Sequence, residues 1–234
     1  MPVLRDPFQE EPLAYPGGSP LIKNTGRLLR RDLIHERVRG GLTYIISEDY
    51  SYKTEAYYRI LTLAMEGKET VPSTRDLLEA YVVPVCLTRA KGAGIPVCEW
   101  GISDERVPVP SILYGISYFA DPSEYSLVRD LETADPVIKY ITGNGKYPFC
   151  YQPVPESAEI VPCVAVFGRT ADAPEPLADL AARAYRLFRI PLMEVISVFT
   201  DTYRLSSITP VRYSKLSRGE KGILEEILAG ECNG

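Results

Sequence analysis

The pattern of apolar and polar positions predicts regular elements most clearly between Thr43 and Leu78. The β-branched and aromatic run Thr43–Ile46 predicts a buried strand. A polar turn, residues 47–53, follows it. Residues 53–65 then predict a helix that is apolar over most of its circumference and that ends at Gly67. The segment therefore predicts a core strand and a core helix, with a polar turn at the carboxyl end of the strand.

The neighbouring segments predict further regular elements. Ser73 and Asp76 have the spacing of an N-cap and a variant capping box, which predicts a second helix. The apolar run at 79–87 predicts a strand, and Pro84 restricts that strand to a sheet edge or a bulge. On the N-terminal side, the apolar stripe of residues 28–38 predicts a helix that ends at a Gly-Gly pair.

The middle of the chain is rich in glycine and proline and is harder to interpret. Residues 111–120 predict a strand, and residues 122–131 predict a helix with Asp121 as its N-cap. The last third has clearer patterns. It predicts a strand at 160–167, a helix at 177–188, a β-hairpin at 192–200 and 203–209, and a helix at 219–229. The pattern indicates a single α+β (mixed α/β) domain, in which helices pack on a sheet and a β-hairpin lies near the C-terminus.

Composition excludes several classes of function. The 234 residues carry a net charge of -5, which argues against a nucleic-acid partner. No apolar run reaches the roughly 18 residues that a membrane span requires, and no signal-peptide core is present. The chain has five cysteines without a C-x-x-C pair and one histidine, so we predict no metal site and no catalytic residue. These features favour a cytoplasmic protein with reduced cysteines.

The polar turn after the first strand is a candidate binding site, because loops at strand ends often carry function. It could bind a polar small molecule or a peptide terminus. The alternative is that its tyrosines pack against the core with their hydroxyl groups in water. Its chemistry-bearing residues are Ser47, Glu48, Asp49, Tyr50, Tyr52 and Lys53.

A second candidate is the turn Gly143, Asn144, Gly145 and Lys146, which could bind a nucleotide or another anion. The spacing differs from that of a P-loop, and Tyr147 stands where a P-loop has Ser or Thr. A turn that needs positive φ angles at Asn and Gly is therefore the stronger interpretation.

Two blocks of sequence carry a family resemblance. Residues 50–77, YSYKTEAYYRILTLAMEGKETVPSTRDL, form the first block. The second combines AVFGR at 165–169, RLFRIPL at 186–192 and YRLSSITPV at 203–211. In order and spacing, both resemble the RimK-like ATP-grasp N-terminal domain family.

The resemblance implies an α+β domain that is usually fused to a RimK-type ATP-grasp ligase, with a role in peptide or amino-acid ligation or modification. Nothing in the chain looks like the ligase's metal-binding carboxylate and Asn set, so we expect the ligase module to be absent. The expected organisation is an extended arm at 1–20, the RimK-like domain at 21–211 with an unassigned insertion at about 90–155, and a helical tail at 212–234.

The resulting hypothesis is a non-catalytic accessory or substrate-recognition domain, which works with a separate ATP-grasp carboxylate-amine ligase. The chain itself would need no cofactor, whereas its partner would use ATP and Mg. An amino acid or a peptide is the expected substrate. The contact surface would combine the turn with Tyr57, Tyr58, Ser73 and Arg169. Two alternatives stay open: a small nucleotide- or metabolite-binding enzyme that uses the middle segment, and a structural subunit that forms a homodimer.

Overall fold

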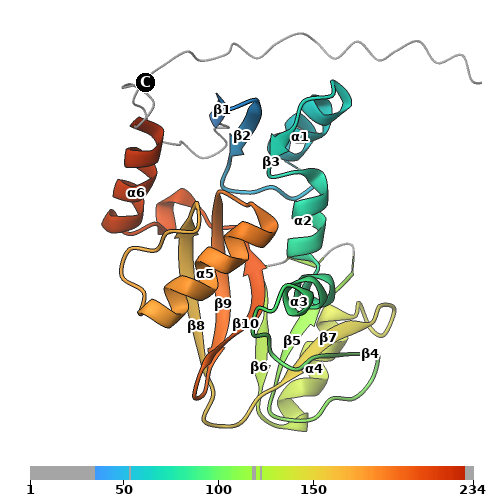
Figure 1. The fold of residues 1–234 in the computed structure, drawn as a ribbon. Helices are drawn as coiled ribbons and strands as arrows, with labels where there is room; N and C mark the ends of the chain where they lie inside the picture. The colour runs from blue at the N-terminus through green and yellow to red at the C-terminus, as the bar shows by residue number, and fades with distance from the viewer. Residues whose placement is uncertain (1–34, 53, 118–119, 122, 230–234) are drawn as a thin grey trace, which may run out of the picture.

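The computed structural model describes residues 35–52, 54–117, 120–121 and 123–229. The expected arm at 1–20 and most of the helix predicted at 28–38 lie outside these ranges. Within them, the strands form three sheets, each accompanied by helices (Figure 1). In the view of Figure 1, one sheet lies at the top, another in the centre and another at the lower right.

The first sheet has the order β1-β2-β3, with β1 at His35–Arg39, β2 at Leu42–Ile46 and β3 at Thr70–Val71. β1 and β2 are antiparallel, so the prediction of helix is wrong for residues 35–38. The cause is the pair Gly40-Gly41, whose φ angles of 57° and 82° make a two-residue hairpin turn. The strand predicted at 43–46 is confirmed as β2.

Helix α1 spans Glu55–Met65 and begins at the N-cap Thr54. Its end is as predicted: Gly67 has a φ of +75°, and the N–H of Lys68 donates to the carbonyl of Leu63 across it. Helix α2, at Thr74–Tyr81, begins at Ser73, and its capping box with Asp76 is confirmed. Local capping chemistry therefore determines both helix ends that the sequence predicted.

The strand predicted at 79–87 is wrong, because these residues belong to α2 and to helix α3 at Val83–Gly92. Val82 has an extended backbone and separates the two helices, and Pro84 lies in the first turn of α3, where proline is tolerated. The buried residues of α3 have helical rather than alternating spacing. They include Val83, Cys86, Leu87 and Ala90, at positions i, i+3, i+4 and i+7.

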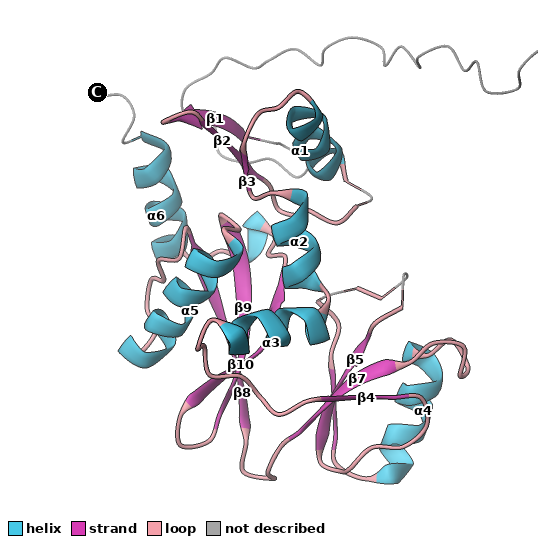
Figure 2. Ribbon diagram, turned by 45° about the vertical axis from the view of Figure 1, so that its right-hand side comes forward, coloured by secondary structure: helices cyan, strands magenta, loops and turns pink. Residues whose placement is uncertain are grey.

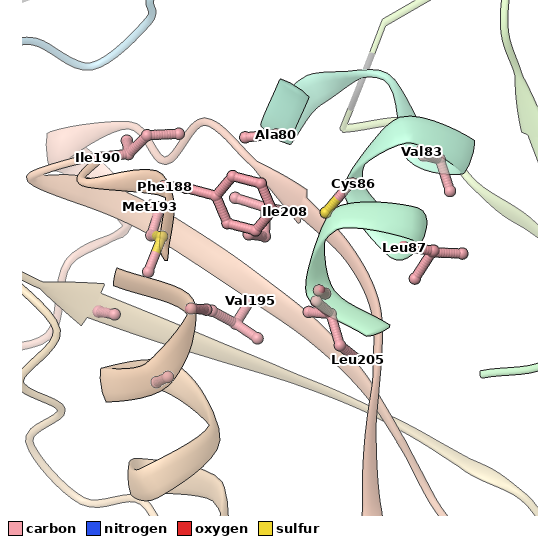
Figure 3. Packing of buried hydrophobic residues seen from close by; sticks show 14 of the residues in the cluster. Ala80, Val83, Cys86, Leu87, Phe188, Ile190, Met193, Val195, Leu205 and Ile208 are labelled. Carbon is pink, nitrogen blue, oxygen red and sulfur yellow. The ribbon is translucent and has the colours of Figure 1, made fainter. Parts of the chain in front are cut away.

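The central sheet, which we call the core sheet, has the order β10-β9-β8 and is antiparallel throughout. Its strands are β8 at Glu159–Val166, β9 at Leu192–Phe199 and β10 at Tyr203–Thr209, and helix α5 at Glu175–Phe188 packs on one face. The predicted strand, helix and hairpin of this region are confirmed. Figure 3 shows the resulting core, in which Phe188, Met193, Val195 and Ile208 belong to one cluster with Cys86 of α3.

The sheet at the lower right of Figure 1 has the order β4-β7-β5-β6. Because it packs beside the core sheet, we call it the second sheet. It contains β4 (Gly101–Ser103), β5 (Ser111–Gly115), β6 (Ser126–Val128) and β7 (Phe149–Pro153), and is accompanied by helix α4 (Leu131–Ile141). The expected insertion at about 90–155 thus contains most of a layer of the fold (Figure 2).

Two predictions in this region need correction. The helix predicted at 122–131 is wrong, because residues 126–128 form β6 and the helix begins after Asp130. That carboxylate accepts from the N–H of Thr133 at 2.7 Å, so it supplies the cap that we assigned to Asp121. The strand predicted at 111–120 is shorter than expected and ends at Gly115.

The C-terminal helix α6 at Arg218–Ala229 is confirmed, and it follows a short 3₁₀ turn, η1, at Tyr213–Lys215. It buries Leu224 against Ile46, Val166 and Leu192, residues of β2, β8 and β9. The α+β class with helices packed on sheets is therefore confirmed. No helix of the described ranges is long and apolar enough to cross a membrane.

Candidate functional site

The polar turn at 47–53 is held mostly by local hydrogen bonds, except that the carboxylate of Glu48 accepts from the N–H of Tyr213 at 2.9 Å. The buried hydroxyl of Tyr50 accepts from the N–H of Ser47 at 2.9 Å and donates to the carbonyl of Ile45 at 3.1 Å. Asp49 accepts from the N–H of Ser51 at 2.7 Å and from its hydroxyl at 3.3 Å. Tyr50 is therefore a core residue, and burial raises the pKa of its hydroxyl above the usual range.

The other residues expected at this surface have different environments. Ser73 is engaged in the cap of α2, and Arg169 forms a bidentate pair with Glu226 of α6 at 3.0 and 3.1 Å. Tyr57 packs partly against the core, whereas Tyr58 is exposed. The two rings meet edge-to-face, with their centroids 5.9 Å apart. Tyr52 is half-buried, and Lys53 lies outside the described residues. Ser73 and Arg169 thus have partners away from the turn, and binding at the turn stays a prediction.

In the Gly143–Lys146 turn, every backbone N–H donates to the chain itself. The acceptors are the carbonyls of Tyr140, Lys139 and Thr142, and the hydroxyl of Thr142. The φ angles of Gly143, Asn144 and Gly145 are 60°, 62° and 77°, which confirms the interpretation as a positive-φ turn. These N–H groups are consequently not free to bind an anion in this conformation.

A different polar cluster joins the core sheet to the second sheet. Strand β10 has a bulge between Leu205 and Ser207, which leaves Ser206 outside the strand pairing. The carbonyl of Ser206 accepts instead from Nε2 of Gln152 on β7 at 2.8 Å. Its hydroxyl lies 2.6 Å from the hydroxyl of Tyr114 on β5. The bulge therefore directs one residue of the core sheet toward two strands of the other sheet.

The hydrogen bonds of this cluster have a defined direction. Ser206 gives its single hydroxyl proton to Oε1 of Gln152 at 2.7 Å, so the hydroxyl of Tyr114 must donate to Ser206. Tyr114 in turn accepts from the hydroxyl of Ser207 at 3.2 Å. All four residues are buried, and burial raises the pKa of Tyr114, which keeps its proton in place. We call Tyr114, Gln152, Ser206 and Ser207 the junction network.

One carboxylate stands on the same face of the core sheet as the junction network. Met193 and Val195 face α5, so the alternation of β9 places Glu194 on the opposite face. Glu194 is paired with Thr209 of β10, whose hydroxyl lies 3.4 Å from its Oε2. Ser207, which bonds to Tyr114 of the second sheet, lies on this face as well.

Tyr125 lies near this carboxylate. Burial and the negative charge of Glu194 raise the pKa of the Tyr125 hydroxyl, and its ring lies 6.1 Å from that of Tyr114. A half-buried Glu194 with Thr209 and Tyr125 nearby thus supplies charge and hydrogen-bonding groups beside the contact between the two sheets. The arrangement can bind a cation or orient a polar ligand.

Sequence reasoning missed this arrangement, although it leaves a signal in the sequence. Glu194 is a single carboxylate inside the apolar run of β9, LMEVISVF, and the two serines interrupt the apolar positions of β10. Polar groups in strands need partners when they are buried, so such positions indicate either a satisfied network or a site. The three-dimensional pairing of the strands distinguishes the two.

The buried thiols show no sign of activation. Burial raises the pKa of Cys98 and of Cys150 to about 12. Burial, together with the charges of Glu220 and Glu194, raises the pKa of Cys163 to about 11. A nucleophilic cysteine requires a lowered pKa, so these three thiols have the environment of core residues.

Solved structures share this fold. A RimK domain protein ATP-grasp from Sphaerobacter thermophilus DSM 20745 is 22% identical, with a TM-score of 0.53 over 73% of this chain and 73% of that one. The D-alanine–D-alanine ligase of Helicobacter pylori is 14% identical, with a TM-score of 0.53 over 73% and 67% of the respective chains. The D-alanine–D-alanine ligase of Bacillus anthracis, complexed with ATP, is 10% identical, with a TM-score of 0.53 over 72% and 70%. No protein-family model and no curated protein matches the sequence.

These similarities correct two expectations. The chain is not a copy that lacks the ATP-grasp module, because ATP-grasp ligases match it over about 73% of its length. The same finding contradicts the hypothesis of a non-catalytic accessory domain for a separate ligase. The physical reason is that residues 90–155, interpreted as an insertion, supply the second sheet that joins the core sheet. The chain has the α+β fold of ATP-grasp ligases.

Proposed function

We propose that this protein is itself a ligase of the ATP-grasp type, which uses ATP to join a carboxylate to an amine. The observation that carries the proposal is the fold similarity to a RimK domain protein and to D-alanine–D-alanine ligases over about 73% of the chain. An amino acid or a peptide is the substrate class that fits those relatives' names.

Within the chain, the proposed binding region is the face of the core sheet that carries Glu194. Both sheets contribute to this region, because the junction network fixes β5 and β7 against β10. A polar ligand there would meet the carboxylate of Glu194, beside which lie Tyr125 and the buried hydroxyl of Thr209. In this proposal the junction network holds the two sheets together, and Glu194 binds the ligand.

The oxygen groups on this face fit a magnesium ion that is bound mainly by the phosphates of a nucleotide. Magnesium at nucleotide sites is commonly held by one or two carboxylates together with the phosphates. Glu194 provides one carboxylate, and Thr209 provides a neighbouring hydroxyl. The described residues contain no cluster of three or more His, Cys, Asp or Glu side chains placed for a metal. Glu194 would therefore hold an ion that the nucleotide chiefly carries, and that ion would neutralise phosphate charge.

The test is ATP binding by isothermal titration calorimetry, with and without magnesium, for the wild type and for Glu194→Gln. We expect the substitution to weaken magnesium-dependent binding by roughly ten- to a hundredfold, since a charge-assisted interaction contributes roughly 1.5–3 kcal/mol. Glu105→Gln is the matched control, because Glu105 is exposed in a loop outside this region. Release of ADP that depends on an added amino-acid mixture would test ligation directly.

The outcomes separate the parts of the proposal. A wild-type chain that binds no ATP at millimolar concentration, with or without magnesium, would overturn the ligase function. Equal magnesium-dependent affinity in the wild type and in Glu194→Gln would keep nucleotide binding and remove Glu194 from the site. ATP binding without amino-acid-dependent ADP release would reject ligation of those substrates.

A further inference from the structure

A groove of about 300 Å³ lies on the other face of the core sheet, between α5 and the β9–β10 hairpin. Phe199 and Tyr203 are paired across the hairpin and lie on the α5 face, in the same alternation as Val195. Glu194 faces the opposite side of the sheet. The groove is therefore distinct from the region proposed for nucleotide binding, and the inference drawn from it does not depend on that proposal.

The floor of the groove is aromatic and preformed. The rings of Phe199 and Tyr203 lie 4.7 Å apart at an interplanar angle of 40°, and both are only half-buried. Leu180 of α5, which is 2% exposed, also lines the groove. An aromatic pair in the lining of a groove offers ring surface to which a cation is attracted electrostatically.

The charged residues that line the groove are mainly acidic. Asp179 projects from α5 and Asp201 from the hairpin turn. The lining also contains Arg183, whose guanidinium donates to the carbonyl of Gly94 and lies 3.8 Å from one oxygen of Asp179. Arg186 lies 4.0 Å from the other oxygen of that carboxylate, so Asp179 already has two cationic neighbours. Within the described residues, Asp201 is exposed and has no ion-pair or hydrogen-bond partner. The groove thus keeps one free carboxylate beside the aromatic pair.

We propose that this groove binds a basic side chain, arginine or lysine, presented by a peptide. The cationic head would lie against the rings of Phe199 and Tyr203, with Asp201 and Asp179 at its edge. A planar guanidinium suits this geometry best, because it stacks on aromatic faces and pairs with carboxylates. The volume is at the lower limit of small-molecule sites, which matches a side chain rather than a nucleotide.

The experiment uses the full chain labelled with ¹⁵N and titrated with capped tripeptides. Acetyl-Gly-Arg-Gly-amide is the probe, and the same peptides with Gln or Glu in the centre are the comparisons. We expect the Arg peptide alone to shift the amide signals of Phe199, Thr202 and Tyr203. Raising the salt concentration from 0.05 to 0.5 M should weaken its binding, since exposed ion pairs are screened.

Two variants locate the binding charge. Asp201→Asn should weaken the Arg peptide about two- to fivefold, and the double variant with Asp179→Asn about tenfold or more. Asp104→Asn, which removes an exposed charge elsewhere, should bind as the wild type does. The spectra report folding directly, so loss of binding in a misfolded variant is recognised. Equal shifts with the Gln peptide, or shifts outside the hairpin and α5, would overturn the proposal.

Discussion

The junction network makes the substitution Tyr114→Phe a sharp test of how the two sheets are joined. The change removes one oxygen atom and keeps the ring, so the packing of the buried side chain stays nearly the same. What is lost is the acceptor for Ser207 at 3.2 Å and the donor to Ser206 at 2.6 Å. The consequence is therefore confined to hydrogen bonding.

The size of the stability loss in Tyr114→Phe depends on which hydrogen-bonding partners of Tyr114 are left without any hydrogen bond. Ser206 still donates to Gln152, whereas the buried hydroxyl of Ser207 has Tyr114 as its acceptor and would lose it. A buried donor without a partner costs roughly 1–3 kcal/mol, so we expect Tyr114→Phe to lower the free energy of unfolding by about 2 kcal/mol. Adding Ser207→Ala removes the unpaired donor and should recover about half of that loss.

Urea unfolding, followed by circular dichroism at neutral pH, measures both values. Tyr140→Phe is the matched control, because Tyr140 is 75% exposed and its loss should change the stability by less than about 0.5 kcal/mol. If Tyr114→Phe changed stability no more than this control, the directed network would not exist as described. An unrecovered loss in the double variant would assign the effect to something other than the donor of Ser207.

Three further predictions concern packing and titration. Leu224→Ala should destabilise the protein by about 2–5 kcal/mol in urea unfolding, because Leu224 is fully buried in the only cluster of the described residues that contains α6. Met65→Ala is the control, because Met65 is exposed and its truncation should leave the stability nearly unchanged. Gly168→Ala should cost roughly 1–3 kcal/mol, since its φ is +77° and the new Cβ would lie 2.8 Å from that of Tyr185; Gly222→Ala, with open space around it, is the control. Burial raises the pKa of the thiols, so the native state keeps protons that the unfolded chain loses above its ordinary pKa of 9.0. The free energy of unfolding should therefore fall from pH 9 upward, and a thiol reagent at pH 8 should react with Cys98, Cys150 and Cys163 only after unfolding.

Local physical chemistry explains which elements could be predicted. The capping box of Ser73, the left-handed Gly67 and the apolar face of α5 each act over a few residues, and each prediction was correct. The failures occurred where two local interpretations compete. Gly40-Gly41 can end a helix or close a hairpin, and only the pairing of β1 with β2 decides between them.

The candidate site was harder to predict because it depends on contacts far apart in the sequence. Ser206 meets Gln152 and Tyr114, which are 54 and 92 residues away, and a local pattern cannot pair them. The polar turn at 47–53 was predicted as a site because its polar residues are adjacent in the sequence, yet the hydroxyl of Tyr50 bonds to the backbone of Ser47 and of Ile45, within five residues. Local clustering of polar residues is often a turn that satisfies its own backbone.

The reverse pattern was the more informative one. Glu194, Ser206 and Ser207 are scattered polar residues inside strands that are otherwise apolar, and each requires a physical reason to be there. For the serines the reason is the junction network, in which both hydroxyls have hydrogen-bond partners. For Glu194 the described residues supply only the 3.4 Å contact with the hydroxyl of Thr209 as a hydrogen bond. Glu194 is only half-buried, so its carboxylate keeps acceptor capacity beyond this one long hydrogen bond, and for that reason we assign it to the proposed binding region.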